Sequence, residues 1–266
     1  MKNIKLLIFL QVVPIALFSQ NFKFTYELRA TPFIQNSSNI INEIGYLHIN
    51  KNINSYFFSE KFLKIDSAYR ILDEQNVSPY SALENFSKFN ANYFFKEFIV
   101  KNYQDSKIEI FRELGIEHFK YQVKSVFQWE VKNEIDTLNN LICQKAVTTY
   151  SGREYVAWFT TEFPFSDGPY VFNGLPGLIV KIADTKNLFQ FKLIHYEKEP
   201  ASFILKPFKY SKALQISLKD FISLRIDLTN DPLKQFIDAG FTIKDSRIPD
   251  MSKTKMSDKI NYIEIE

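Results

Sequence analysis

Four apolar runs in the second half of the chain constrain its fold more than any other feature. They read ICQKAVTTY from Ile142, REYVAWFTTEF from Arg153, LIVKIAD from Leu178 and LFQFKLIHYEK from Leu188. β-branched and aromatic residues dominate these runs, as is typical of strands. Ser151–Gly152 and residues 185–187 supply turn chemistry between neighbouring runs. The pattern predicts consecutive antiparallel strands joined by tight turns.

The first half of the chain predicts further strands and one helix. Phe22, Phe24, Tyr26 and Leu28 alternate with polar residues, which is the period of a half-buried strand. Residues 45–50 and 54–60 read as a hairpin around an Asn-rich turn at 51–53. Residues 62–75 carry apolar side chains at helical spacing. Four segments favour an antiparallel meander: 92–101, 107–111, 117–124 and 126–132.

Near the C-terminus, the spacing of apolar residues changes from that of strands to that of helices. Ser217, with Asp220 three residues later, predicts the start of one short helix. Asp231–Pro232 predicts the start of a second helix, and Gly240 its end. Both helices are amphipathic, so we expect them to cover the sheet.

These patterns together predict a mainly β (α+β) fold, a curved antiparallel sheet or half-open barrel with short covering helices at 62–75 and 217–239. We expect a single domain over residues 21–245. The charged residues that follow predict a loosely ordered tail at 246–266.

The N-terminus predicts a signal peptide over residues 1–20. Two lysines precede a 13-residue apolar run from Leu6 to Phe18, which is too short for a membrane span. Cleavage after Ser19 or Gln20 would release a chain that does not span the membrane. We therefore expect a protein exported to the periplasm or the extracellular space. No cysteine stands in this segment to accept a lipid, so a lipoprotein is not expected.

Charge and cysteine content exclude several function classes. The formal net charge is only +3 and the basic residues are dispersed, which argues against a nucleic-acid partner. One cysteine excludes an intramolecular disulfide. Four of the seven glycines fall within residues 152–177, so we expect positive φ angles or close backbone approaches there.

An ordered set of motif residues suggests a family. Its members are Trp129, Cys143, Lys145, Gly152, Arg153, Trp158, Gly168, Pro169 and the hexapeptide Gly174, Leu175, Pro176, Gly177, Leu178 and Ile179. In this order they resemble the GLPGLI family of exported bacterial proteins, whose biochemical activity is not established. The resemblance therefore implies membership of a family but does not imply a function.

The hexapeptide allows two interpretations. Its glycines and proline shape a turn before a buried strand, which would set the register of two strands. Alternatively, the turn and the preceding residues 166–169 form the mouth of a cavity. The sequence around it lacks the Lys-Ser/Thr pair of a phosphate-binding loop.

Few residues suggest catalysis or metal binding. The sequence has no Gly-x-Ser-x-Gly and no His-Glu-x-x-His motif. His48, His118 and His195 fall on separate predicted strands, where half-exposed side chains are expected in preference to a three-His metal site. Cys143 lies in an apolar strand and is expected to be inert, although it could act as a nucleophile with a histidine. No catalytic residue, metal or cofactor is therefore assigned.

Other polar and aromatic residues have structural interpretations. Lys145, Arg153, Glu154 and Glu162 are expected to pair across a solvated sheet face. Trp129 and Trp158 are expected to anchor the core, with ligand stacking as the alternative.

The leading functional hypothesis is a non-enzymatic binding or accessory protein that holds an apolar ligand or a partner segment on its concave face. The runner-up is a docking subunit of an outer-membrane assembly, which would use a strand edge or the C-terminal helices. A third hypothesis is a hydrolase with a site around Arg153, Glu154 and Asp167.

Overall fold

The computed structural model of the protein describes residues 21–32, 39–50, 53–75, 94–115, 117–124 and 127–231. Three expected features lie outside these residues: the signal peptide at 1–20, the second C-terminal helix after Asp231 and the tail at 246–266.

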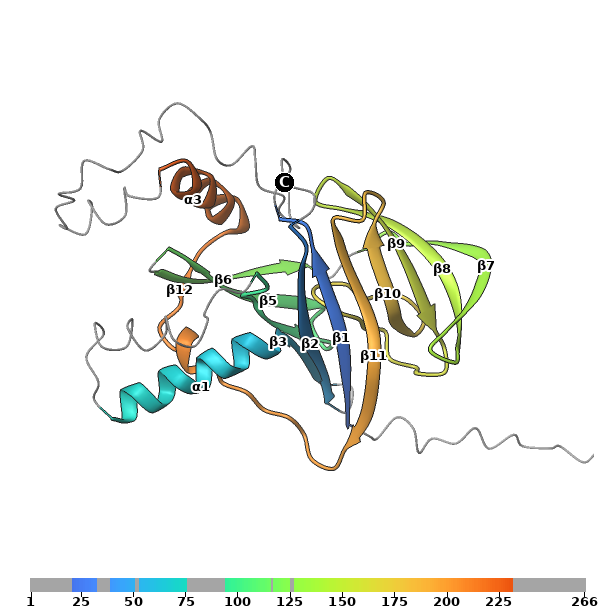
Figure 1. The fold of residues 1–266 in the computed structure, drawn as a ribbon, viewed down its shortest axis with the longest axis horizontal. Coiled ribbons are helices and arrows are strands. Elements are labelled where there is room, and N and C mark those ends of the chain that lie inside the picture. The colour runs from blue at the N-terminus through green and yellow to red at the C-terminus, as the bar shows by residue number, and fades with distance from the viewer. Residues whose placement is uncertain are drawn as a thin grey trace, which may run out of the picture.

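The described strands form one open, mixed sheet (Figure 1). In chain order they are β1 (Asn21–Ala30), β2 (Ile41–Asn50), β3 (Asn54–Ser59), β4 (Phe98–Asn102), β5 (Lys107–Leu114), β6 (Glu117–Lys124), β7 (Glu130–Leu138), β8 (Leu141–Tyr150), β9 (Arg153–Thr160), β10 (Leu178–Asp184), β11 (Phe189–Glu199) and β12 (Leu214–Gln215). Their order across the sheet is β12-β6-β5-β4-β3-β2-β1-β11-β10-β9-β8-β7. The mainly β fold and the open sheet are as predicted, except that the short β12 runs parallel to β6.

The N-terminal strand β1 lies in the middle of the sheet. It pairs with β2 on one side and with β11 on the other, antiparallel in both cases. Phe22, Phe24, Tyr26 and Leu28 are all buried, so the predicted alternation is confirmed. Strand β1 therefore joins a unit made from the first half of the chain to one made from the second.

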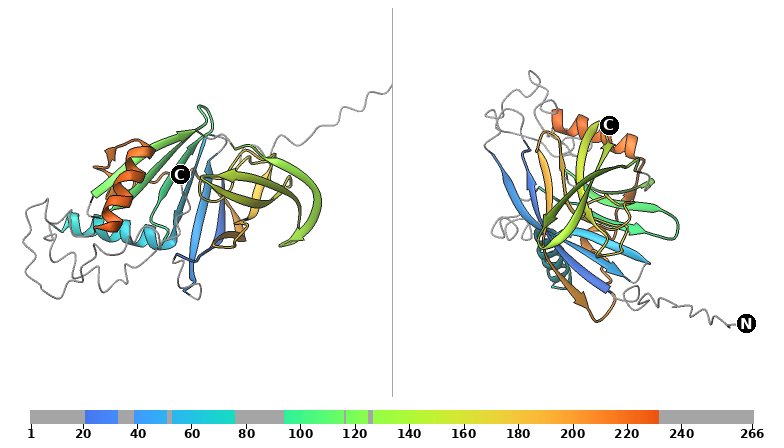
Figure 2. Two further views of the ribbon diagram at one scale, coloured as in Figure 1. Left: turned by 90° about the horizontal axis from the view of Figure 1, so that it is seen from above. Right: turned by 90° about the vertical axis from the view of Figure 1, so that its right-hand side faces the viewer.

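The predicted meander holds for β4, β5 and β6 but not for β7. Strand β7 does not pair with β6; it lies at the opposite edge of the sheet, against β8. Asn139 and Asn140 both have positive φ, 52° and 62°, and form a two-residue turn between β7 and β8. This tight turn determines the partner of β7. Figure 2 shows β7 and β8 arching away at the end of the sheet.

Two helices cover opposite faces of the sheet. Helix α1 (Glu60–Glu74) begins where the Ser59 hydroxyl accepts a hydrogen bond from the Phe62 amide, and it buries Phe62 and Ile65. Helix α3 (Leu218–Asn230) has Ser217 as its N-cap and packs Phe221 against the other face. The predictions of helices at 62–75 and from 217 are confirmed. No helix in the described ranges is long and apolar enough to cross a bilayer.

A strap at residues 200–207 crosses the face that carries α1. The Phe203 ring stacks on the His48 ring, with centroids 3.7 Å apart, and the His48 Nδ1 lies 2.9 Å from a Glu199 carboxylate oxygen. The expectation of half-exposed histidines is therefore wrong for His48, because the strap leaves it only 4% exposed. His118 is half-buried and His195 is exposed.

The buried position of His48 predicts a pH dependence of stability. Burial lowers the pKa of His48 from its ordinary value, although Glu199 opposes this shift. As the pH falls below about 6.5, the unfolded chain binds a proton at His48 that the folded chain resists. The free energy of unfolding should therefore decrease on acidification, and this decrease should be smaller in His48→Gln.

Urea unfolding of residues 21–266 at pH 7.5 and pH 5.5 measures this difference. The exposed His195 provides the control, since His195→Gln should retain the wild-type pH dependence. If His48→Gln and wild type lose the same free energy between the two pH values, the assignment is wrong.

Candidate functional site

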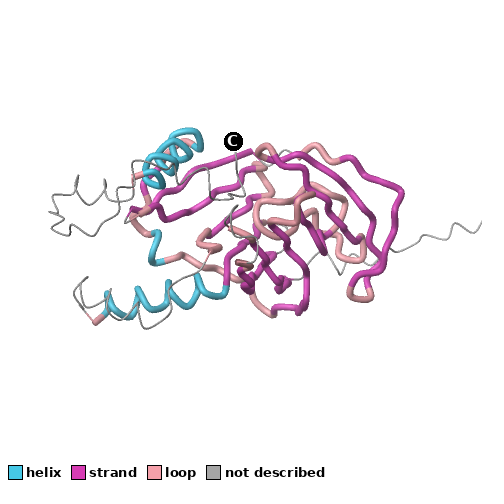
Figure 3. The backbone as a smooth tube through the Cα atoms, turned by 45° about the horizontal axis from the view of Figure 1, so that its top comes forward, coloured by secondary structure: helices cyan, strands magenta, loops and turns pink. Residues whose placement is uncertain are grey.

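The connection between β9 and β10, residues 161–177, contains the glycine-rich motif. It folds back inside the curve of the sheet, as the long pink segment of Figure 3 shows. Tyr170, Val171 and Phe172 are completely buried in the main core, whereas Ser166 and Gly174 are exposed. The Gly174 amide donates to the Ser166 carbonyl, 3.4 Å away, and closes the loop on itself. The segment is therefore a compact plug with one solvent-facing rim.

The glycines of this plug act mainly by allowing close approach. A Cβ atom on Gly177 would lie 2.1 Å from the Thr160 carbonyl oxygen, and one on Gly168 would lie 2.7 Å from the Ile179 Cβ. Gly174 has a positive φ of 93°, whereas the φ of Gly177 is not positive. The glycine concentration thus has the expected physical reasons. At Gly177 the reason is the neighbouring backbone of β9, which pairs with β10 from Leu178 onward.

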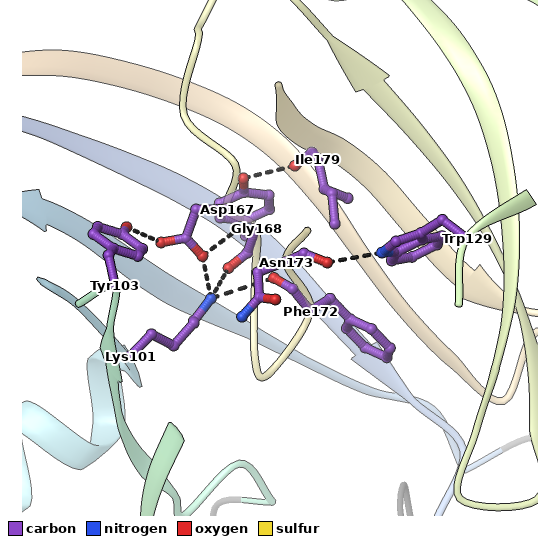
Figure 4. A network of polar contacts seen from close by, with 9 residues as sticks. Lys101, Tyr103, Trp129, Asp167, Gly168, Phe172, Asn173 and Ile179 are labelled. Carbon is purple, nitrogen blue, oxygen red and sulfur yellow. Dashed lines mark hydrogen bonds and ion pairs between the residues drawn. The ribbon is translucent and has the colours of Figure 1, made fainter. Parts of the chain in front are cut away.

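A buried ion pair attaches the plug to the other half of the sheet. The Lys101 ammonium of β4 contacts the Asp167 carboxylate, and their side chains are 1% and 0% exposed (Figure 4). The same nitrogen donates to the carbonyls of Gly168 at 2.5 Å and Phe172 at 3.4 Å. The other Asp167 oxygen accepts a hydrogen bond from the Tyr103 hydroxyl. Both charges are therefore paired and hydrogen-bonded, as buried charges must be.

Burial and charge determine the protonation of this cluster. Burial lowers the pKa of Lys101, and the Asp167 carboxylate opposes that shift. Burial and the same carboxylate raise the pKa of Tyr103 well above its ordinary value, so its hydroxyl keeps its proton. Because the Lys101 nitrogen has three acceptors for its three protons, it has no donor left for a substrate.

Two further hydrogen bonds lie on either side of the Gly174–Gly177 turn, one at Asn173 in the plug and one at Ile179 in β10. The indole nitrogen of Trp129, which precedes β7, donates to the Asn173 carbonyl at 2.8 Å. The Tyr26 hydroxyl donates to the Ile179 carbonyl at the same distance. Trp129 is only partly buried, so it holds the residue before the hexapeptide at the margin of the core. Trp158 is likewise partly buried against the core.

A pocket of about 450 Å³ opens beside the buried ion pair. One wall comes from β4, β5 and their turn, and the other from the plug. The lining residues are Lys101, Asn102, Tyr103, Ser106, Lys107, Pro164, Phe165, Ser166, Asn173 and Gly174. Ser166 and Gly174 thus lie at the mouth of a cavity, whereas Gly168 and Pro169 do not line it.

The remaining motif residues lie away from this pocket. Cys143 is buried in β8, and burial raises the pKa of its thiol to about 11, which disfavours the reactive thiolate. Lys145 is half-buried, and its ammonium lies 3.1 Å from a Glu134 carboxylate oxygen. Gly152 forms the β8–β9 turn with a φ of 74°. Leu175, Leu178 and Ile179 are core residues, and Pro176 is exposed.

The prediction that Arg153 lies on a solvated sheet face is wrong. Arg153 is only 8% exposed, lies 3.6 Å from Asp184 and covers the Phe189 ring. Asp167, by contrast, contacts Lys101 and Tyr103. The two charged groups of the hypothesised hydrolase site thus have partners on different strands, and Glu154 is exposed.

The histidines are likewise dispersed. His48, His118 and His195 lie on β2, β6 and β11. Over the described ranges, no group of three or more His, Cys, Asp or Glu side chains could hold a metal ion.

Sequence reasoning missed Lys101 and Tyr103. A signal was present, because Lys101 follows Ile99 at the period of a strand and so shares its inward face. A lysine on the buried face of an apolar strand requires a partner, but the sequence does not show that Asp167 supplies it.

Comparison with known proteins finds a similar family, but the function of that family is unknown. A family model described as "Protein of unknown function (Porph_ging)" matches residues 94–181, a range that includes both Lys101 and the hexapeptide. The GLPGLI name remains a resemblance. No curated protein matches the chain.

Solved structures show a shared fold. Two crystal forms of PNGF-II superimpose with TM-scores of 0.51 and 0.53, both at 14% identity and over 77% of this chain. This chain spans about a third of the length of those proteins, covering 33% and 32% of them. The LolA superfamily protein NE2245 from Nitrosomonas europaea is 7% identical over 72% of this chain and 90% of its own, with a TM-score of 0.25.

The buried ion pair predicts an asymmetry between single and double variants. Lys101→Met leaves the Asp167 charge buried without its partner and should lower the free energy of unfolding by about 3–5 kcal/mol. Lys101→Met combined with Asp167→Leu removes both charges and should cost less than the sum of the single changes. Urea unfolding measures all three variants.

Lys107→Met provides the control, because Lys107 lines the same pocket but is exposed, and it should change the free energy by no more than about 0.5 kcal/mol. If the loss of unfolding free energy in the double variant equals the sum of the losses in the two single variants, the two side chains do not interact.

The close approach at Gly177 gives a second prediction. Gly177→Ala places a methyl group against the Thr160 carbonyl and should lower both the midpoint of thermal unfolding and the yield of folded protein. Lys145→Ala, which removes only a solvent-accessible pair with Glu134, should change neither. Equal midpoints for the two variants would contradict the close packing of the hexapeptide on β9.

Proposed function

We propose that this protein is an exported binding or accessory protein of the periplasm or cell surface. Its pocket between the β4–β5 turn and the 161–177 plug receives a small ligand or a short segment of a partner. The pocket volume of about 450 Å³ lies within the usual range for ligand sites.

The Lys101–Asp167 ion pair is the observation that carries this proposal. It joins the two walls of the pocket, because Lys101 belongs to β4 and Asp167 to the plug. Walls joined in this way are preformed, so a ligand does not need to order them when it binds. The trio Lys101, Tyr103 and Asp167 supports the site in this way.

The same hydrogen bonds favour binding over catalysis. Lys101 and Asp167 are 1% and 0% exposed, Tyr103 is partly buried, and all three make hydrogen bonds to one another or to the plug. A general base or nucleophile needs a free lone pair within reach of the substrate. These three residues therefore have a supporting role in the proposed function.

The pocket lining indicates a ligand of mixed polarity. Phe165 and Pro164 offer apolar surface, and Asn102, Ser106 and Ser166 offer amide and hydroxyl groups. The aromatic side chains that were expected to line an apolar site pack mainly against one another, for example Phe24 against Phe163. The ligand we propose thus combines apolar surface with hydrogen-bonding groups.

The export of the protein is part of the proposal. Strand β1 begins at Asn21, next to the expected cleavage site after Ser19 or Gln20. Cleavage at that site would leave the central strand of the sheet whole. N-terminal sequencing of the protein from an exporting host should give Gln20 or Asn21 as the first residue.

Native mass spectrometry of the exported protein tests the binding site. Wild type should carry extra mass that disappears on denaturation. Ser166→Trp fills the pocket with an indole ring and should lose that mass. Thr161→Trp is the matched control, because Thr161 is exposed on the same segment but does not line the pocket. Equal ligand mass on wild type and Ser166→Trp would contradict the proposal.

The open edge at β7 favours a second candidate function, a docking subunit of an outer-membrane assembly. Ile135 and Ile142 are 68% and 65% exposed on the β7–β8 hairpin, beside an edge strand that could pair with a partner strand. A docking subunit would carry a second polypeptide in the same spectra. That mass should be lost in Ile135→Lys and retained in Ser166→Trp.

A further inference from the structure

A second pocket, of about 330 Å³, lies on the other side of the plug rim. Its lining residues are Phe22, Leu141, Glu162, Phe163, Pro164, Phe165, Tyr196, Glu197 and Lys198. Pro164 and Phe165 also line the first pocket. The two cavities therefore share a wall that is only two residues long.

Aromatic packing supports this shared wall. The Phe165 ring lies 5.3 Å from the Phe22 ring, and the Phe163 ring lies 4.7 Å from the Tyr196 ring in a T-shaped contact. Phe22 and Phe165 are 3% and 4% exposed. Phe165 thus belongs to the packed core, whereas Pro164 is exposed on the rim, and the packing of Phe165 fixes the wall between the two pockets.

The second pocket differs from the first in its chemistry. Six of its nine lining residues are aromatic or aliphatic, and the other three are charged; Tyr196 is 44% exposed. Asparagine and serine side chains line the first pocket but not the second. An apolar group would bury its surface in the second pocket, whereas a group rich in hydroxyls would find few partners there.

Charges at its rim balance one another. Glu197 pairs with Lys23 at 3.0 Å. Lys198 and Glu162 carry opposite charges, and a Glu162 oxygen already accepts a hydrogen bond from the Ile142 amide at 2.9 Å. An ionised ligand group would therefore meet no excess of opposite charge. The charge balance selects an uncharged group.

We propose that the two pockets are subsites for one extended peptide segment of a partner protein. An aromatic or branched aliphatic side chain enters the pocket beside Tyr196, and the adjoining backbone and polar side chains occupy the pocket beside Lys101. This inference rests on the proposed function, since it assigns the ligand class of that site.

Fluorescence anisotropy with labelled hexapeptide pools tests the assignment. Each pool holds one fixed residue at the third position and mixed residues elsewhere, and each is titrated with residues 21–266. Pools with Phe, Trp, Leu or Ile fixed should bind at least about tenfold more tightly than pools with Ala or Asp fixed.

Variants at β11 locate the apolar subsite. Tyr196→Ser should remove the tenfold preference, and Tyr196→Phe should retain it because the ring rather than the hydroxyl supplies the surface. Ile194→Ser is the matched control, since Ile194 is 48% exposed on the same strand but does not line the pocket. Circular dichroism should show the same folded state for all three.

The outcomes separate this inference from the proposed function. If Ser166→Trp abolishes binding but Tyr196→Ser keeps the preference, the apolar subsite is wrong and the proposed function stands. If Tyr196→Ser abolishes binding but Ser166→Trp does not, the proposed function fails at its pocket. Equal binding of all pools, or binding of maltohexaose with no binding of any pool, would overturn the peptide assignment.

Discussion

The ion pair between Lys101 and Asp167 is the contact on which the arrangement around the motif depends. It crosses from β4, in the first half of the chain, to the plug that follows β9. Two charges this deeply buried are stable only because the Gly168 and Phe172 carbonyls, the Gly168 amide and the Tyr103 hydroxyl complete their hydrogen bonds. The position of the plug is therefore determined by polar geometry as well as by apolar packing.

The position of the plug in turn creates the two pockets. Its buried side carries Tyr170 and Phe172 into the core, and its exposed rim carries Pro164 and Ser166. The rim divides a cavity of mixed polarity from one lined mainly by aromatic and aliphatic residues, because its two flanks face different surroundings. One flank faces the β4–β5 turn, and the other faces the aromatic side chains of β1 and β11. The proposal of a binding function with two subsites rests on this division.

Local patterns could predict most of the elements because each pattern expresses short-range physics. The alternation in β1, the Ser217 cap of α3 and the Ser151–Gly152 turn depend on neighbouring residues alone. The meander prediction for residues 126–132 is wrong in its partner strand, because β-propensity does not determine which strand pairs with which. Its Asn139–Asn140 turn was a usable signal, since positive φ at both positions joins consecutive strands directly.

Most strands, both described helices and the places where the backbone needs glycine could be predicted from residue patterns, because these depend on side-chain period and steric limits. The candidate site could not be predicted, because it depends on contacts between distant parts of the chain. Lys101 and Asp167 are 66 residues apart in the sequence. Their contact depends on the sheet order that places β4 near the plug. His48 and Arg153 were likewise expected at the surface, but both are buried, and they pair with Glu199 and Asp184 respectively. Such pairs form only when distant strands come together, since no local interaction selects them.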